Sequence, residues 1–233
     1  MLSAIVTGAS RGLGFALAEA LARRGWRLVI DGRDAEALER AAARLRDRTD
    51  VVALAGSVTD PWHRLALVDA ARTGTPRGGI DLLVNNASTL GPSPLPPLSA
   101  YPLDQLDEVY RVNVLAPLAL TQLALPRLAD GARIVNVTSD AAVEAYEGWG
   151  GYGSSKAALE QLTSVLAAEN PGLRMYAVDP GDMNTSMHQA AFPGEDISDR
   201  PPPEASVPGL LALIEGDLPS GRYAARALAE ARA

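Results

Sequence analysis

The chain has 233 residues, 47% of them hydrophobic, which is enough to build the core of one large α/β domain. A formal net charge of −7 argues against a nucleic-acid partner, and the absence of cysteine excludes a disulfide scaffold, a thiolate metal site and cysteine-based catalysis. No apolar run reaches the roughly 18 to 20 residues that a membrane span requires, and no basic leader opens the chain, so we expect a cytoplasmic protein. Lys156 is the only lysine among the 21 basic residues.

Short β-branched runs alternate with longer stretches of helical period, a pattern that predicts βαβ units and a parallel sheet. The predicted strands are Leu2–Thr7, Arg27–Asp31, Val51–Ala55, Ile80–Asn85, Ala132–Thr138, Leu173–Val178 and Arg222–Ala224. The predicted helices are Gly12–Arg24, Ala35–Asp47, Asp60–Arg72, Leu103–Leu128 and Tyr152–Glu169. Asp34 is expected to cap the second helix, and Pro117 to kink or break the fourth. We therefore predict one α/β domain over residues 1–233, a doubly wound, seven-stranded parallel sheet flanked by helices.

Two proline-rich stretches, Gly91–Pro102 and Gly181–Pro208, interrupt this pattern. Their composition predicts no packed secondary structure. Each follows the end of a strand, where doubly wound sheets bind their ligands. We interpret both as candidate rims of a pocket and residues 181–208 as a substrate loop, with plain surface loops as the alternative.

A glycine-rich turn, Thr7-Gly8-Ala9-Ser10-Arg11-Gly12-Leu13-Gly14, lies between the first predicted strand and helix. Glycines let the backbone approach a pyrophosphate, which the free N–H groups of a helix N-terminus can hold. The spacing Gly-x-x-x-Gly-x-Gly resembles that of the short-chain dehydrogenase/reductase family. The resemblance implies a Rossmann-type domain whose cofactor contacts include Gly8, Ser10, Arg11, Gly12, Leu13 and Gly14.

The end of the second strand bears on the choice of nicotinamide cofactor, because an acid there can hold the ribose 2′-hydroxyl and a base can hold a 2′-phosphate. In register with the family, Gly32 occupies the position that is acidic in NAD users, and Arg33 follows it. Arg11 adds a second guanidinium, so we expect NADP(H) to be preferred. Asp31 is the counter-evidence, because a slip of one residue would put its carboxylate on the ribose, and NAD(H) stays possible.

Further cofactor contacts follow from the family resemblance. Ser57-Val58 stands where the family has Asp-Val against the adenine, and Asn85-Asn86-Ala87-Ser88 is similar to the family's Asn-Asn-Ala-Gly. Asn85 is expected to be chiefly structural. The turn after the sixth strand matches Pro-Gly-x-x-x-Thr and borders the nicotinamide in such proteins. The residues implied to bind cofactor are Ser57, Val58, Asn86, Ala87, Pro180, Gly181, Met183 and Thr185.

Tyr152 and Lys156 lie four residues apart, on one face of the last long helix. The pKa of a tyrosine is near 10, and a neighbouring ammonium favours the phenolate, so the pair can serve as a tunable acid and base. The resemblance adds Ser139, which would bond the substrate oxygen, and Asn113, which would help hold a water near the lysine. We predict Asn113, Ser139, Tyr152 and Lys156 as catalytic residues, with Tyr152 and Lys156 also contacting the cofactor.

Substrate contacts can be assigned only by position along the chain. We select Glu144, Tyr146 and Trp149, between Ser139 and Tyr152, and Met187 and His188 on the suspected loop; Phe192 also lies there. The two imidazoles, His63 and His188, lack the spacing of a metal site, so no metal is predicted and a surface position is favoured for both.

The predicted function is an NADP(H)-dependent carbonyl reductase or alcohol dehydrogenase with a small-molecule substrate. A sensor that binds the cofactor without turnover is the alternative in another class. Epimerase or dehydratase chemistry on nucleotide sugars usually needs a longer substrate domain than the stretch after Pro180 provides. The resemblance also implies a homodimer or homotetramer formed through the two long central helices.

Overall fold

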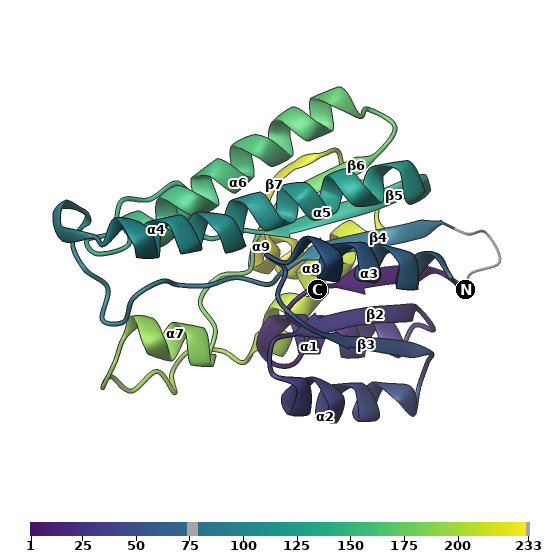
Figure 1. The fold of residues 1–233 in the computed structure, drawn as a ribbon, viewed down its shortest axis with the longest axis horizontal. Helices are drawn as coiled ribbons and strands as arrows, with labels where there is room; N and C mark the ends of the chain where they lie inside the picture. Colours follow the sequence, from purple (N-terminus) through teal and green to yellow (C-terminus); the bar gives the residue numbers. More distant parts are fainter. Residues whose placement is uncertain (74–78, 232–233) are drawn as a thin grey trace.

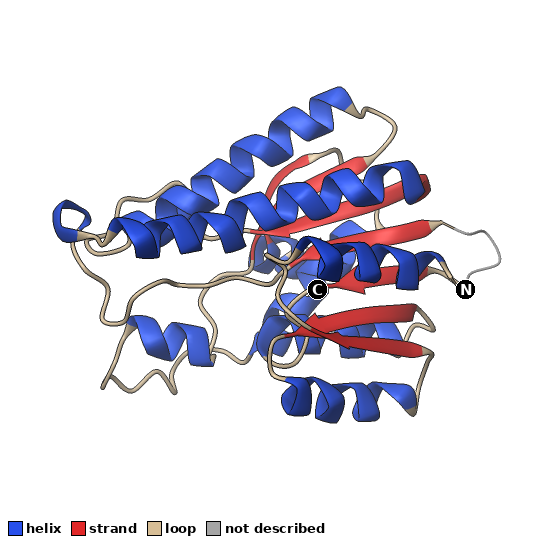
Figure 2. Cartoon of the chain, in the orientation of Figure 1, coloured by secondary structure: helices blue, strands red, loops and turns tan. Residues whose placement is uncertain are grey.

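The computed structural model describes residues 1–73 and 79–231. One parallel sheet of seven strands, in the order β3-β2-β1-β4-β5-β6-β7, runs through it (Figures 1 and 2). Its strands are β1 (Ser3–Val6), β2 (Arg27–Gly32), β3 (Val51–Ala55), β4 (Ile80–Asn85), β5 (Leu128–Val137), β6 (Arg174–Asp179) and β7 (Gly221–Ala224). The strand order reverses between β1 and β4, which is where ligands bind in open α/β sheets. The predicted fold class is confirmed.

The described α-helices are α1 (Gly12–Ala22), α2 (Ala35–Arg46), α3 (Pro61–Arg72), α4 (Leu103–Tyr110), α5 (Ala116–Ala124), α6 (Gly150–Glu169), α7 (Ser186–Ala191), α8 (Val207–Glu215) and α9 (Ala225–Glu230). Asp34 caps α2 as predicted, because its side chain accepts a hydrogen bond from the backbone N–H of Ala37 at 3.0 Å. None of these helices is long and apolar enough to cross a membrane.

Alternating strand residues build a core on each face of the sheet. Ala4 and Val6 of β1 belong to a buried cluster that includes residues of α1, α2 and α8. Ile5, between them, faces a second cluster with residues of α3 and α5. The sheet is therefore covered on both faces, and a ligand can approach its parallel strands at the edge formed by their carboxyl ends (Figure 1).

The predicted helix over Leu103–Leu128 is interrupted beside Pro117, as expected. Residues Arg111–Leu115 form a π turn, and the backbone N–H of Ala116 bonds the carbonyl of Arg111, five residues back. Pro117 has no N–H to give to the carbonyl of Asn113, so the regular α-helical ladder cannot run through this point. The helix then ends at Ala124 rather than Leu128, because Leu128 already belongs to β5.

Both proline-rich stretches contain helices, so the prediction that they lack packed secondary structure is wrong. The first holds a short 3₁₀ helix at Leu98–Ala100, and the second holds α7, a 3₁₀ helix at Pro203–Ser206 and the start of α8. Thr185 caps α7 by accepting a hydrogen bond from the N–H of His188 at 3.2 Å. Prolines are tolerated here because they precede these helices or lie in their first turns.

Candidate functional site

The glycine turn forms a cradle of backbone at the N-terminus of α1. Gly8 and Gly12 have positive φ angles of 65° and 58°, which a residue with a side chain rarely adopts. A Cβ on Gly14 would lie 2.5 Å from the carbonyl oxygen of Gly8 and from the amide nitrogen of Asn86. The Nδ2 atom of Asn86 donates to the carbonyls of Thr7 and Gly8, at 2.8 and 3.1 Å. The turn and the end of β4 are thus locked together, with Asn86 facing the turn.

Two arginines, Arg11 just before α1 and Arg33 just after β2, are exposed near the glycine turn. The side chains of Arg11 and Arg33 are exposed, and within residues 1–73 and 79–231 neither has a hydrogen bond or ion pair. A Cβ on Gly32 would lie 3.1 Å from the side chain of Ser10. Among the described residues, both guanidiniums are therefore unpaired, and position 32 carries no carboxylate.

Asp31, the alternative ribose ligand, faces elsewhere. Its side chain is buried, and Oδ1 accepts a hydrogen bond from the N–H of Gly8 at 2.6 Å. Its other oxygen, Oδ2, lies 3.1 Å from Nε2 of His63. His63 is also buried, and the side chain of His188 is only 12% exposed, so the expectation that both imidazoles lie on the surface is wrong. His63 packs against Gly56 at the end of β3, and Nδ1 of His188 lies 3.9 Å from Oδ1 of Asp182.

Of the residues predicted to contact the adenine, Val58 and Ala87 have small apolar side chains. Val58 packs with Ala87, Val112 and Ala116, while the Ser57 hydroxyl bonds the Thr59 hydroxyl at 2.8 Å. Asn85 has the structural role expected of it. Its Nδ2 donates to Oδ1 of Asn136 at 2.7 Å and so joins β4 to β5.

Tyr152 and Lys156 project from the first turns of α6, and both are buried. The Nζ atom of Lys156 donates to the carbonyl of Val137 at 2.9 Å and lies 5.4 Å from the centroid of the Tyr152 ring. Burial lowers the pKa of Lys156 to about 7. Burial also raises the pKa of Tyr152, with smaller contributions from the charges of Asp179 and Asp140.

Asn113 lies in the π turn and is almost completely buried. Its Oδ1 accepts hydrogen bonds from the N–H of Thr89 at 2.9 Å and the hydroxyl of Ser88 at 3.0 Å. Its Nδ2 donates to the carbonyl of Thr89 at 2.8 Å and to the Ser155 hydroxyl at 3.0 Å. Asn113 therefore ties the loop after β4 to α6, next to Tyr152 and Lys156.

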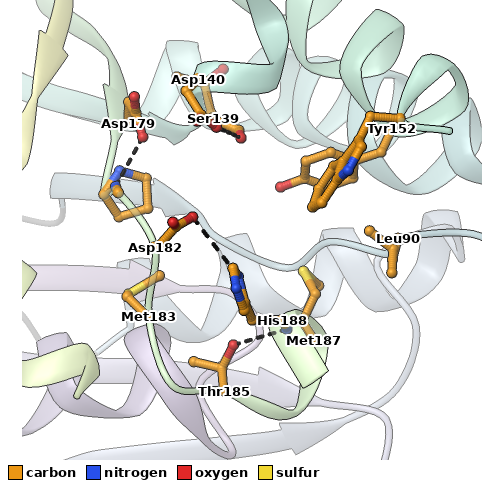
Figure 3. Close-up of a pocket in the computed structure, with 14 residues that line it drawn as sticks. Leu90, Ser139, Asp140, Tyr152, Asp179, Asp182, Met183, Thr185, Met187 and His188 are labelled. Atoms are coloured by element: carbon orange, nitrogen blue, oxygen red, sulfur yellow. Dashed lines mark hydrogen bonds and ion pairs between the residues drawn. The ribbon is translucent and has the colours of Figure 1, made fainter. Parts of the chain in front are cut away.

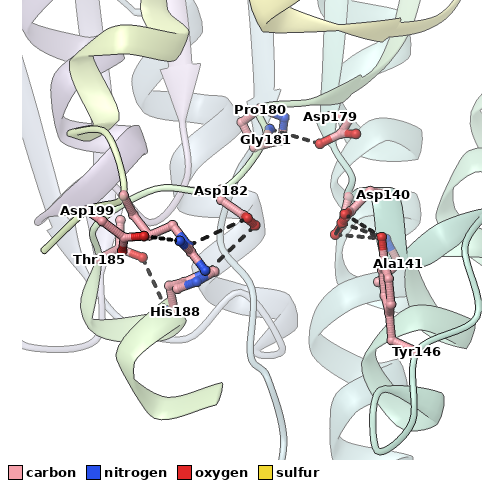
Figure 4. Close-up of polar contacts among 12 residues, drawn as sticks. Asp140, Ala141, Tyr146, Asp179, Pro180, Gly181, Asp182, Thr185, His188 and Asp199 are labelled. Carbon is pink, nitrogen blue, oxygen red and sulfur yellow. Dashed lines mark hydrogen bonds and ion pairs between the residues drawn. The ribbon is translucent and has the colours of Figure 1, made fainter. Parts of the chain in front are cut away.

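Ser139 lies two residues after the end of β5, and its hydroxyl donates to Oδ1 of Asp140 at 2.8 Å. The other oxygen of Asp140 accepts a hydrogen bond from the Tyr146 hydroxyl at 3.0 Å. Figure 4 shows Asp140 and Tyr146 on one side of the site, with Asp182 and His188 on the other. Ser139 must turn its hydrogen away from Asp140 before it can donate to a ligand.

An open cavity brings several of these residues together (Figure 3). Ser139 and Tyr152 point toward the same space. The predicted residues that line it are Ser139, Trp149, Tyr152, Pro180, Gly181, Met183, Thr185, Met187 and His188. Glu144 and Tyr146 are exposed and do not line it, although Tyr146 reaches Asp140. Phe192 packs on Trp149, with ring centroids 6.0 Å apart.

Sequence reasoning missed the carboxylates of this cavity, Asp140, Asp179 and Asp182, and the arginine behind it. Arg222 of β7 lies 3.0 Å from Oε1 of Glu160 and 3.4 Å from Oδ2 of Asp179, and donates to the carbonyl of Ser139 at 3.3 Å. Burial raises the pKa of Asp179. The sequence could have indicated Asp140, because it follows the predicted catalytic residue Ser139. Arg222 could not be predicted, because only the pairing of β7 with β6 brings it next to Asp179.

The comparisons with known proteins agree with this architecture. The family model described as short chain dehydrogenase matches residues 3–196. The chain is similar to sepiapterin reductase from Mus musculus, with 34% identity over 80% of this chain and 76% of that protein. It is also similar to 2-(R)-hydroxypropyl-CoM dehydrogenase from Xanthobacter autotrophicus, with 37% identity over 84% of this chain and 80% of that protein.

Among solved structures, a short chain dehydrogenase from Shigella flexneri complexed with NADP superposes with a TM-score of 0.86 and 29% identity, covering 96% of each chain. Within the part of the chain that the structure describes, no group of three or more His, Asp or Glu residues could hold a metal ion. The fold, the family match and the extent of these similarities show that the chain belongs to the short chain dehydrogenase family.

Proposed function

We propose that this oxidoreductase is an NADP(H)-dependent carbonyl reductase or alcohol dehydrogenase acting on a small molecule. The observation that carries the proposal is the cavity into which both Ser139 and Tyr152 point, with Lys156 beside the Tyr152 ring. The backbone cradle at Gly8–Gly14 supports it, since free N–H groups at a helix N-terminus suit a pyrophosphate. The cavity accepts the reacting end of the substrate beside Ser139 and the start of α6.

In the direction of reduction, Tyr152 donates its phenolic proton to the substrate oxygen, and Ser139 donates a hydrogen bond to the same atom. A nicotinamide held beside Pro180, Gly181 and Thr185 would supply the hydride. Lys156 stabilises the phenolate that Tyr152 becomes, and Asn113 holds the loop and helix around it. Asp140 accepts the hydrogen bond of the Ser139 hydroxyl until a substrate oxygen competes for it. In oxidation the substrate alcohol gives its proton to the Tyr152 phenolate.

The preference for NADP(H) rests on Arg11 and Arg33, which have no partner among the described residues, and on Gly32, which leaves no acid to repel a 2′-phosphate. The enzyme from Shigella flexneri, with NADP bound, supports it by similarity. Asp31 does not oppose it, because both of its oxygens are engaged inside the protein.

Replacing Arg11 and Arg33 together with alanine is expected to weaken NADPH binding by roughly 30- to 100-fold, because two charge-assisted contacts with the phosphate are lost. NADH binding should change by less than about threefold. Titration of cofactor fluorescence measures both affinities. The matched control is Arg48→Ala, which removes an exposed arginine from the far end of α2. Tighter binding of NADH than NADPH by the unaltered protein would contradict the assignment.

The function itself is tested by following NADPH oxidation with a panel of aldehydes and ketones. We expect turnover of several neutral carbonyl compounds. A sensor would bind NADPH with saturable affinity and turn over none of them, so that pattern would replace the enzyme proposal with the sensor.

We also propose that the chain forms a homo-oligomer through its long helices. Leu103, Leu115 and Val165 are exposed on α4, the π turn and α6, where a second copy could cover them.

A further inference from the structure

Asp31 holds the glycine turn at two successive peptide groups. Its carboxylate accepts the N–H of Gly8 at 2.6 Å, and its own carbonyl accepts the N–H of Ala9 at 2.9 Å. From the other side, the carbonyl of Gly8 accepts the amide of Asn86 at 3.1 Å. The Gly8 residue, with its positive φ, is thus fixed at both its N–H and its carbonyl.

His63 completes this arrangement from α3. Its Nε2 lies 3.1 Å from Oδ2 of Asp31, at the opposite oxygen from Gly8. The ring fills the space over the end of β3, so closely that a Cβ on Gly56 would overlap it. The N–H of Gly56 in turn bonds the carbonyl of Gly32 at 3.0 Å. Asp31 and His63 therefore connect the ends of β1, β2 and β3.

A buried carboxylate is costly unless each oxygen has a donor, and here Gly8 and His63 provide one each. Neither Asp31 nor His63 lines the cavity of Tyr152, and the proposed reaction uses neither. The three strand ends that they join are those that would face pyrophosphate, ribose phosphate and adenine. Interactions at this position can determine whether the glycine turn already has its binding conformation before the cofactor binds.

We propose that Asp31 and His63 form a positioning pair that presets the glycine turn for NADP(H), so that the cofactor binds a cradle that is already shaped. The inference rests on the proposed cofactor function. The pair is expected to affect how tightly NADPH binds and not the rate of hydride or proton transfer. Loss of the pair should raise the Kd for NADPH and its KM while kcat at saturation stays nearly unchanged.

The experiment compares His63→Leu with His63→Gln, whose amide can still donate to Asp31. We expect Kd for NADPH, measured by fluorescence titration, to rise at least about tenfold in His63→Leu and to stay within about threefold in His63→Gln. Gly56→Ala tests the same pair independently, because the added methyl displaces the ring without removing it. It should also weaken binding at least about fivefold.

A matched control is Arg27→Met, at the opposite end of β2. Arg27 is buried and bonds Asp50 at 2.7 Å and the carbonyl of Ala70 at 3.0 Å, so its loss destabilises the same strand away from the turn. Its Kd should match that of the unaltered protein. Equal Kd values in His63→Leu and the unaltered protein would overturn the inference. If His63→Leu does not fold, unchanged affinity in Gly56→Ala would overturn it, whereas failure of the unaltered protein to bind NADPH would overturn the proposed function instead.

Discussion

Replacing Tyr152 with phenylalanine is expected to lower kcat by roughly 10²- to 10⁴-fold, the contribution of one general acid and base. The phenolic oxygen is the only group that the change removes. The ring keeps its edge-on contact with Trp149, at a centroid distance of 5.8 Å, so the helix and the cavity keep their shape. Because the glycine cradle lies elsewhere, Kd for NADPH should stay within about twofold. Steady-state kinetics and fluorescence titration measure the two quantities.

The control for this change is Tyr223→Phe. The hydroxyl of Tyr223 donates to the carbonyl of Pro219 at 2.8 Å and does not line the cavity. Its removal should leave kcat within about twofold of the unaltered enzyme. Nearly full activity in Tyr152→Phe would refute the role proposed for the phenol, whatever the control shows.

Replacing Lys156 with methionine is expected to have two opposite effects, a loss of most activity and a gain in the stability of the cofactor-free protein. Activity falls because no cation remains to stabilise the Tyr152 phenolate. Stability rises because folding buries the amine and lowers its pKa from 10.5 to about 7. At pH 6 the folded protein must hold a buried ammonium, which methionine does not carry.

The sign of the pH dependence follows from proton binding. Between pH 7 and 10.5 the unfolded chain keeps the proton on Lys156 and the folded chain releases it. The contribution of Lys156 to stability therefore improves as pH rises through this window and is least favourable below it. At about 1.4 kcal/mol per pKa unit, less about 1 kcal/mol for the lost hydrogen bond to Val137, Lys156→Met should gain about 2 to 4 kcal/mol at pH 6.

Urea unfolding of both proteins at pH 6 and pH 9.5, without cofactor, measures the free energies. The gain at pH 6 should be largely lost at pH 9.5. Lys156→Arg is the informative comparison, because a guanidinium stays charged and is bulkier, so it should destabilise the fold at both pH values. A gain for Lys156→Met that is equal at both pH values would contradict the titration of a buried amine.

Local signals in the sequence predicted a large part of this structure. The bounds of β3 and β4 match the prediction, and Asp34 caps its helix, because β-branched runs and capping residues act over a few positions. The start of β5 was missed because Asp130 and Gly131 are typical of a turn. The strand accommodates Gly131 at a φ of +73°.

Other elements depend on contacts that no local pattern contains. Helix α8 (Val207–Glu215) was not predicted, because Pro208 and Gly209 at its start are typical helix breakers. The proline lies in the first turn, where it is tolerated, and a Cβ on Gly209 would overlap the backbone of Ala225. The pairing of Asp31 with His63 spans 32 residues and exists only after β2 and α3 pack together.

The π turn at Arg111–Leu115 restricts where residues can be inserted into or deleted from this chain. A π turn adds one residue to a helical path, which rotates everything after it by about 100° relative to a continuous α-helix. The faces of α4 and α5 are therefore set out of phase by a single residue. Deleting one residue here would remove the π turn, and it would then turn Asn113 away from Thr89 or swing α5 off the sheet. Insertions and deletions should accumulate in the loops of this enzyme and be absent from this segment, whose residue count is as constrained as the identity of Asn113.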